Sequence, residues 1–213
     1  MVILSKEIFF PTVTDTDEDG LYAIGGDLSS ERLLLAYRKG IFPWFNEDEP
    51  ICWYSPDPRF ILLPTEIKVS KSMQAFMKKN VFSFTINKSF NDVIENCRKA
   101  VRKYGPGTWI SNQVLEAYKE LNNLGFAESV EVWEDDKLVG GLYGVKMGKV
   151  FFGESMFSLR SNASKFGFIK YVSLLQSQGI QLIDCQVYTS HLESLGARPI
   201  PRVEFLDLLQ RYL

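Results

Sequence analysis

The sequence is poor in the residues that build metal centres and covalent cross-links. It has one histidine, His191, and three cysteines, Cys52, Cys97 and Cys185, which lie far apart and lack the close spacing of zinc ligands. Any Ser-His-Asp triad would therefore have to use His191. No apolar run approaches the roughly 20 residues of a membrane span, and the start lacks the basic flank and cleavage site of a signal peptide. These absences predict a reduced, cytoplasmic protein without zinc or a disulfide framework.

Charge is unevenly distributed along the 213 residues, although the formal net charge is only −2. Residues 1–60 contain eleven acidic and five basic side chains, a net −6, whereas residues 61–105 contain three acidic and nine basic ones, a net +6. A basic block in an otherwise acidic protein is a candidate phosphate-facing surface. Charge runs of this size are also common on solvated helix faces, so charge alone leaves both interpretations open.

Hydrophobic periodicity and capping residues predict most of the secondary structure. A helix capped by Ser29 or Ser30 should follow the Gly-Gly-Asp at 25–27, and the proline-rich segment 40–59 is predicted as a rigid loop with one short strand at most. Ser89 and Ser111 are expected to cap two further amphipathic helices. In all, the later helices are predicted over residues 70–79, 89–101, 111–124, 163–178, 191–195 and 203–212, and the later strands over 81–86, 129–133, 138–146, 150–156 and 182–187.

The second half of the chain predicts a particular order of elements: an antiparallel meander, a long helix and a further strand. This order resembles that of GNAT-type acyltransferases. The resemblance implies an α+β fold, in which a GNAT-like domain over residues 64–213, a mixed and largely antiparallel sheet flanked by helices, is preceded by a small N-terminal domain over residues 1–63. GNAT enzymes cradle coenzyme A on a glycine-rich loop before the long helix. Here residues 159–164 contain no glycine, which suggests a different acyl donor.

Ten short motifs run in order along nearly the whole chain. Together they resemble the bacterial leucyl/phenylalanyl-tRNA–protein transferase family, and ten motifs in register are far more specific than one. The motifs are G-L-Y-A-I-G-G-D-L-S (20–29), Y-R-K-G-I-F-P-W-F (37–45), W-Y-S-P-D-P-R (53–59), G-T-W-I (107–110), S-V-E-V-W (129–133), L-V-G-G-L-Y-G-V (138–145), F-G-E-S-M-F-S (152–158), N-A-S-K (162–165), L-I-D-C-Q (182–186) and H-L-E-S-L-G-A (191–197).

The resemblance implies an aminoacyltransferase of the N-degron (N-end rule) pathway. Such an enzyme takes Leu or Phe from leucyl-tRNA or phenylalanyl-tRNA and adds it to the α-amino group of an N-terminal Arg or Lys, which marks the acceptor protein for degradation. Met as a further donor stays open. The donor ester is already activated, so no cofactor and no metal are expected. The enzyme has to position the amine, assist the loss of its proton and stabilise the oxyanion.

The resemblance assigns Asp184 and Gln186 to the catalytic centre, where Gln186 contacts the attacking amine and Asp184 orients and polarises Gln186. Two positions apart on a strand, their side chains share one face unless a bulge intervenes. Glutamine is a very poor base, so we expect Gln186 to position the amine while the proton leaves through water, a ribose hydroxyl or Asp184. Outside this motif, an Asp and a Gln on a core strand more commonly satisfy buried neighbours.

The resemblance also implies the substrate contacts. Glu154 lies among apolar residues, where a carboxylate needs a partner; a core salt bridge is the ordinary interpretation, and the family match favours recognition of a cationic amine. Trp44 and Trp109 match the aromatic residues that pack on the terminal adenosine, since base stacking suits any tRNA. The wall of the Leu/Phe pocket is implied at Leu142, Tyr171, Leu175 and Ile183, with Tyr171 where the family has phenylalanine, and tRNA contacts are implied at Lys68, Lys71, Lys78 and Lys79.

Two other functions stay open from the residues alone. A coenzyme A-dependent N-acetyltransferase would share the order of elements, but the glycine-rich loop is missing. A non-catalytic tRNA-binding module would share the basic block, but it would not need Asp184 and Gln186. His191 is expected to be structural, and Trp53 and Trp133 are expected in the core.

Overall fold

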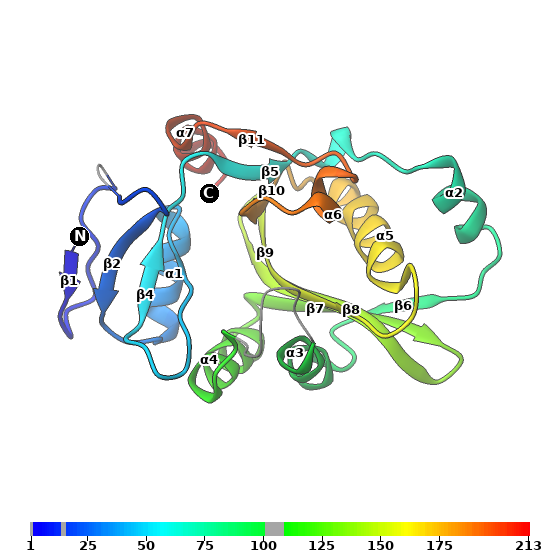
Figure 1. Ribbon diagram of the computed structural model, residues 1–213, viewed down its shortest axis with the longest axis horizontal. Helices are drawn as coiled ribbons and strands as arrows, with labels where there is room; N and C mark the ends of the chain where they lie inside the picture. The colour runs from blue at the N-terminus through cyan, green and yellow to red at the C-terminus, as the bar shows by residue number, and fades with distance from the viewer. Residues whose placement is uncertain (1, 14–15, 101–108) are drawn as a thin grey trace.

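The computed structural model describes residues 2–13, 16–100 and 109–213, which form two sheets and their helices (Figure 1). The smaller sheet lies at the N-terminal end, with strand order β1-β2-β4-β3, and α1 packs beside it. β1 and β2 are parallel, whereas β4 is antiparallel to both β2 and β3. These elements are β1 (Val2–Leu4), β2 (Leu21–Gly25), α1 (Ser30–Arg38), β3 (Phe42–Pro43) and β4 (Cys52–Tyr54).

The larger sheet has seven strands in the order β11-β5-β10-β9-β8-β7-β6. β9 and β10 are parallel and all other neighbours are antiparallel, so the expected mixed, largely antiparallel sheet is confirmed. The chain enters this sheet at β5, so it changes sheet between residues 54 and 59, just before the predicted domain boundary at 63/64. The strands are β5 (Arg59–Leu62), β6 (Ser83–Ile86), β7 (Ala127–Glu134), β8 (Lys137–Met147), β9 (Val150–Ser158), β10 (Leu182–Gln186) and β11 (Arg198–Ile200).

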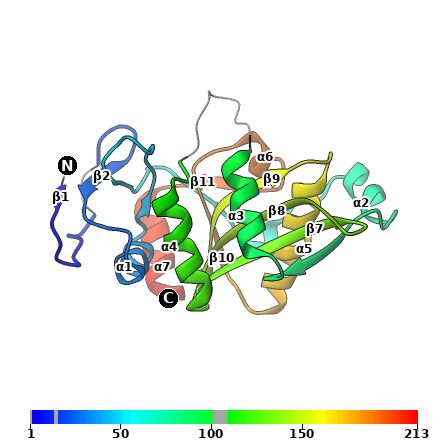
Figure 2. The same cartoon turned by 90° about the horizontal axis from the view of Figure 1, so that it is seen from below.

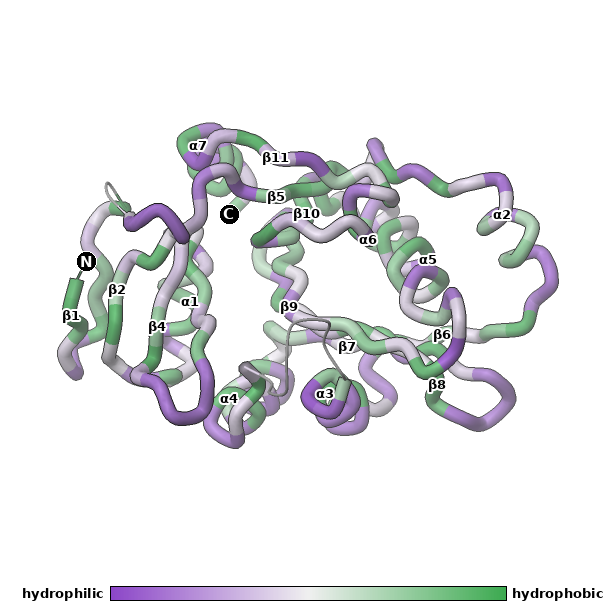
Figure 3. Tube along the Cα trace, in the orientation of Figure 1, coloured by the Kyte–Doolittle hydropathy of each residue, from purple (hydrophilic) through white to green (hydrophobic). Residues whose placement is uncertain are grey.

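Helices cover both faces of the larger sheet. α3 and α4 lie on one face and α5 on the other, as the two views show (Figures 1 and 2). Figure 3 shows hydrophobic stretches concentrated in the strands and hydrophilic residues in the connections. No helix of the described residues is long and apolar enough to span a bilayer. The bounds are η1 (Pro64–Glu66), α2 (Lys71–Met77), α3 (Phe90–Lys99), α4 (Asn112–Asn123), α5 (Ala163–Ser177), α6 (Ser190–Glu193) and α7 (Arg202–Tyr212).

The predicted helix starts are confirmed, with one difference in how a cap is made. The hydroxyls of Ser29 and Ser111 each accept a hydrogen bond from a backbone N–H in the first turn of the following helix. Ser89 precedes α3, but its side chain does not cap that helix. Instead Glu131, fully buried on β7, accepts the backbone N–H groups of Lys88 and Ser89, at 3.3 and 3.2 Å. A carboxylate from the sheet therefore supplies the negative charge at this helix terminus.

The first 60 residues contain more short strands than expected. The segment 40–59, predicted as a rigid loop with one short strand at most, contains both β3 and β4, and β1 and β2 precede α1; these strands are two to five residues long. Strands this short give no measurable period-two signal, and prolines obscure what remains. The predicted helix break at residues 105–107 lies outside the described residues.

Candidate active site

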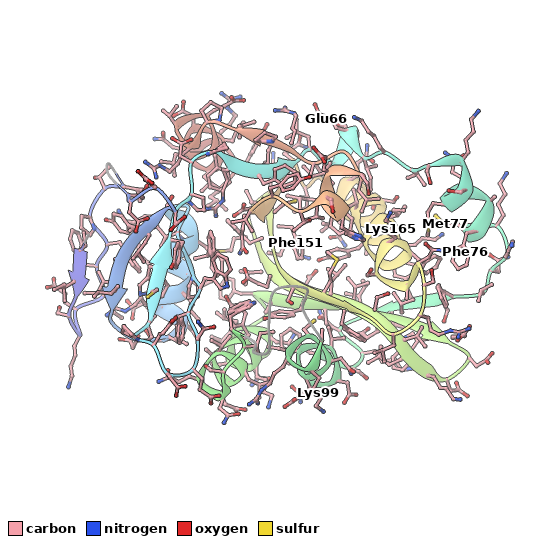
Figure 4. The ribbon with its side chains drawn as sticks, viewed as in Figure 1. Glu66, Phe76, Met77, Lys99, Phe151 and Lys165 are labelled. Atoms are coloured by element: carbon pink, nitrogen blue, oxygen red, sulfur yellow. The ribbon has the colours of Figure 1, made fainter. Side chains whose placement is uncertain are left out.

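A cavity of about 450 Å³ lies where the small sheet faces the centre of the larger one. Its wall is predominantly apolar and aromatic, and it comes from both sheets and from α5 and α6. Phe151, labelled in Figure 4, is one such residue on β9. Hydroxyl groups in the wall come from Ser155, Ser158, Ser164 and Thr189. The other lining residues include Phe42, Pro43, Trp44, Ala100, Trp109, Leu142, Tyr143, Glu154, Met156, Phe157, Phe168, Ile183, Asp184, Cys185, Gln186, His191 and Leu192.

A bulge on β10 separates the two residues expected at the catalytic centre. The pairing register with β5 shifts between Asp184 and Gln186, and Gln186 has a left-handed φ of 63°. The backbone N–H of Gln186 donates to Asp184 Oδ1 at 2.9 Å, while its side-chain Nε2 donates to Glu154 Oε1 at 3.1 Å. Asp184 therefore contacts the main chain of Gln186. The role of orienting the Gln186 side-chain amide, expected for Asp184, is taken by Glu154.

Asp184 is held by Arg59, which the sequence analysis did not assign. Arg59 Nε and Nη2 donate to the two carboxylate oxygens at 2.8 and 2.6 Å, and both side chains are buried. The guanidinium also contacts two rings, with its Cζ 4.7 Å from the centroid of Phe42 and 4.5 Å from that of Phe205. Burial of an aspartate on a core strand is the signal that could have prompted a search for this cation, because buried charges are rare without a partner.

Glu154 is the centre of a second polar cluster. Tyr37 donates to its Oε1 at 2.8 Å and Tyr118 to its Oε2 at 3.0 Å, while the two tyrosine hydroxyls lie 2.5 Å apart. Desolvation raises the pKa of Glu154 to about 7 against the lowering effect of the two tyrosine hydrogen bonds, and the charge of Asp184 adds to the rise. Burial also raises the pKa of Tyr37 and Tyr118 well above the usual value, so both keep their protons.

The apolar residues expected around the donor side chain form two layers. Leu142 and Ile183 line the cavity, as predicted. Tyr171 and Leu175, which were expected in the same wall, lie behind it and do not line the cavity. Phe151 stands at the cavity and packs edge-on against Tyr171, with ring centroids 5.0 Å apart.

The hydroxyl of Tyr171 points to a partner on the sheet. It donates to Glu128 Oε2 at 2.7 Å, and Glu128 also forms an ion pair with Lys146. A buried hydroxyl needs a hydrogen-bond partner, and here a carboxylate on β7 provides it. Because the Tyr171 hydroxyl is engaged by Glu128, it adds no polar group to the cavity wall.

The two tryptophans expected at the tRNA end both line the cavity, but they differ in exposure. Trp44 is 44% exposed and contacts Tyr54 edge-on, with centroids 5.6 Å apart, whereas Trp109 is 7% exposed and contacts Tyr118. Only Trp44 presents a large free ring surface. Of the tryptophans expected in the core, Trp53 is fully buried, and Trp133 is partly exposed.

The lysines expected to contact tRNA do not line the cavity. Lys71, at the start of α2, and Lys78 and Lys79, which follow it, are exposed, and α2 lies at the end of the molecule opposite the small sheet (Figure 1). Lys68 is exposed beside a separate shallow hollow at Gly196. A tRNA contact at these lysines would thus be distant from the site of acyl transfer.

His191 has a different setting from the one expected. It lines the cavity from α6, where burial, and then the charge of Lys165, lowers its pKa. Among the described residues no group of three or more His, Cys, Asp or Glu side chains is arranged to hold a metal ion. The three cysteines are free.

The site thus combines an apolar cavity with the carboxylates of Glu154 and Asp184 in its wall. A family profile described as leucyl/phenylalanyl-tRNA protein transferase matches residues 61–210, and a second, for the N-terminal domain of the same enzyme, matches residues 26–57. The chain belongs to the leucyl/phenylalanyl-tRNA protein transferase family.

The chain is similar in sequence to two curated relatives and only weakly similar to a solved structure. The leucyl/phenylalanyl-tRNA–protein transferase of Flavobacterium johnsoniae is 56% identical over 210 residues, which are 99% of each chain. That of Christiangramia forsetii is 53% identical over 211 residues, covering 98% of this chain and all of the relative. A GCN5-related N-acetyltransferase from Kribbella flavida is 10% identical, with a TM-score of 0.39, over 78% of this chain and 59% of its own. A likeness at that TM-score carries no argument.

Proposed function

We propose that this aminoacyltransferase moves Leu or Phe from aminoacyl-tRNA to the N-terminal Arg or Lys of acceptor proteins. The cavity supports this assignment because it combines an apolar wall with a carboxylate. Leu142, Phe151 and Ile183 suit a Leu or Phe side chain, and Glu154 suits an amine. Transfer brings the donor's apolar side chain and the acceptor's amine together at one ester, so a single site must satisfy both groups at once.

The tRNA end of the donor is assigned to the exposed edge of the cavity at Trp44. Trp44 offers a ring on which the terminal adenine can stack, and such stacking contributes roughly 1–3 kcal/mol for any base. The remaining tRNA acceptor stem then extends to a positively charged surface, for which Lys68, Lys71, Lys78 and Lys79 are the candidates. Phosphate contacts there position the RNA without reading its sequence.

Catalysis in this proposal depends on placement more than on a strong base. The ester is already activated, and the α-amine, with a reference pKa of about 8, is partly neutral at pH 7. Gln186 lies on the bulge where its side chain reaches the cavity, so it can position the amine against the ester carbonyl. Asp184 and Arg59 hold that bulge through the Gln186 backbone.

The larger sheet is assigned to a GNAT-like domain that uses an acyl donor other than coenzyme A. The loop before α5 ends at Asn162, which has a left-handed φ of 69° and makes no side-chain cap. This loop has none of the glycines that let a backbone approach a pyrophosphate closely. An aminoacyl-tRNA donor also implies a cytoplasmic location.

The test is transfer of label from leucyl-tRNA or phenylalanyl-tRNA to peptides that begin with Arg, Lys or Ala. We expect label in the Arg and Lys peptides and none in the Ala peptide, which differs only in its first side chain. Acetyl-CoA is added in a parallel calorimetric titration, where no heat of binding is expected. Acetyl transfer, or donor binding without any transfer to peptide, would replace the proposal by one of the two alternative functions.

A further inference from the structure

Three polar side chains from three separate elements form a closed ring beside the cavity. Tyr37 comes from α1, Tyr118 from α4 and Glu154 from β9. Each member contacts the other two: the hydroxyls lie 2.8 and 3.0 Å from the carboxylate oxygens and 2.5 Å from each other. Both tyrosines are fully buried, whereas Glu154 lines the cavity. The ring thus has one member that a substrate can reach.

The number of protons in this ring depends on the state of Glu154. Two hydroxyl protons are present in either state, and there are three oxygen–oxygen contacts. When Glu154 is ionised, one hydroxyl can donate to each carboxylate oxygen, and the Tyr37–Tyr118 contact has no proton. When Glu154 is protonated, three protons serve three contacts, because Glu154 donates to Tyr118, Tyr118 to Tyr37, and Tyr37 back to Glu154. A carboxyl group that is hydrogen-bonded in both states is suited to gain and lose a proton.

We propose that the ring of Glu154, Tyr37 and Tyr118 accepts the proton that the acceptor α-amine loses during transfer. This step rests on the proposed function. The amine nitrogen bonds to the ester carbonyl carbon, the bond from that carbon to the ribose oxygen breaks, and one amine proton passes to Glu154. Glu154 then returns that proton to the ribose oxygen, directly or through water, so the ring ends the cycle as it began. Starting from the neutral amine, transfer as a whole releases and consumes no proton.

The neighbouring charged groups favour Glu154 over Asp184 for this role. Both oxygens of Asp184 are engaged by Arg59, and the backbone N–H of Gln186 also donates to it. Among the described residues no cation forms an ion pair with Glu154, although the charge of Arg59 lowers its pKa, and its other neighbour is the side-chain amide of Gln186, 3.1 Å away. Gln186, the proposed positioner of the amine, therefore lies in direct contact with the proton acceptor. Tyr143 on β8 packs against Tyr118 in the ring, with centroids 5.5 Å apart.

The sign of the pH dependence follows from the pKa of Glu154, which is raised to about 7. Below that pKa the ring already holds its extra proton and cannot accept another. The single-turnover rate should therefore increase with pH through about 7. The tyrosine hydrogen bonds lower the pKa of Glu154, so removing one of them should move the midpoint of the increase to higher pH.

The experiment measures single-turnover transfer from saturating leucyl-tRNA to an arginine-initiated peptide across that pH range. Glu154→Gln should lose the increase centred near pH 7, keep only the increase due to the acceptor amine with its reference pKa of about 8, and fall by about 100-fold or more, the range of general base catalysis. Tyr118→Phe should retain the increase with its midpoint moved upward. Tyr188→Phe, the same change at an exposed tyrosine outside the cavity, should keep the wild-type profile. Leucyl-tRNA affinity and thermal unfolding establish that each variant is folded.

The outcomes separate this inference from the function on which it rests. If the wild-type chain transfers no leucine at any pH, the proposed function itself fails. If it transfers leucine and Glu154→Gln keeps the wild-type rate and profile, or only raises KM for the peptide, Glu154 is a binding group and the inference is overturned. Infrared difference spectra give a second readout without turnover: the carboxylic acid band that appears on acidification near neutral pH should be missing in Glu154→Gln.

Discussion

Arg59 and Asp184 form a two-pronged ion pair in which Nε lies 2.8 Å from Oδ1 and Nη2 lies 2.6 Å from Oδ2. Replacing Arg59 by Met should lower the free energy of unfolding by about 3–5 kcal/mol, because the Asp184 charge stays buried without its partner. Urea unfolding measures this loss. The double variant Arg59→Met with Asp184→Leu removes both charges and should recover much of it. A double variant as unstable as Arg59→Met alone would show that packing against Phe42 and Phe205 is the main contribution.

Asp184→Asn should lower kcat and kcat/KM together while leaving the affinity for leucyl-tRNA nearly unchanged. The reason is that Asp184 holds the bulge that aims Gln186, and it has no assigned contact with RNA. Single-turnover rates and filter binding of leucyl-tRNA provide the two measurements. A variant with wild-type kcat and only a raised KM would remove Asp184 from the catalytic centre.

Sequence periodicity predicts five of the seven strands of the larger sheet and the helices that cover it, and it misses β5 and β11, which are only four and three residues long. It also identifies Tyr37 and Tyr118 as buried. Their hydroxyl contacts with Glu154 span 117 and 36 positions, and no local pattern encodes a partner so far away. The bulge at Gln186 is equally silent, since its left-handed backbone is formed without glycine. The resemblance supplied Asp184, Gln186 and Glu154, and the structure adds their partners Arg59, Tyr37 and Tyr118.

Leu142→Trp should reduce the use of phenylalanyl-tRNA more than that of leucyl-tRNA. Leu142 is buried in the cavity wall, so a larger side chain there fills space that the bulkier donor needs first. The measurement is the ratio of kcat/KM for the two donors in one reaction. Equal loss for both donors, together with a lower melting temperature, would identify Leu142 as a core residue only.

Lys71→Ala, Lys78→Ala and Lys79→Ala should each weaken the binding of different charged tRNAs by similar factors. Each lost phosphate contact should flatten the slope of log K against log salt by about 0.7 to 1 unit. Affinity at several salt concentrations measures both effects. Trp44→Ala is the matched comparison: stacking releases few ions, so affinity for the charged end should fall at an almost unchanged slope. Lysine variants with the wild-type slope would leave this surface as a solvated helix face.

The position of Phe205 has a consequence for how the enzyme is made. Its ring packs against the Arg59 guanidinium, as does that of Phe42. During synthesis Phe42, Arg59 and Asp184 all leave the ribosome before Phe205, which lies on α7. Native packing around the buried pair is thus completed only when residues 202–212 have emerged, since domains fold as their chain becomes available. A nascent chain therefore completes the site that would bind charged tRNA only after α7 has been synthesised.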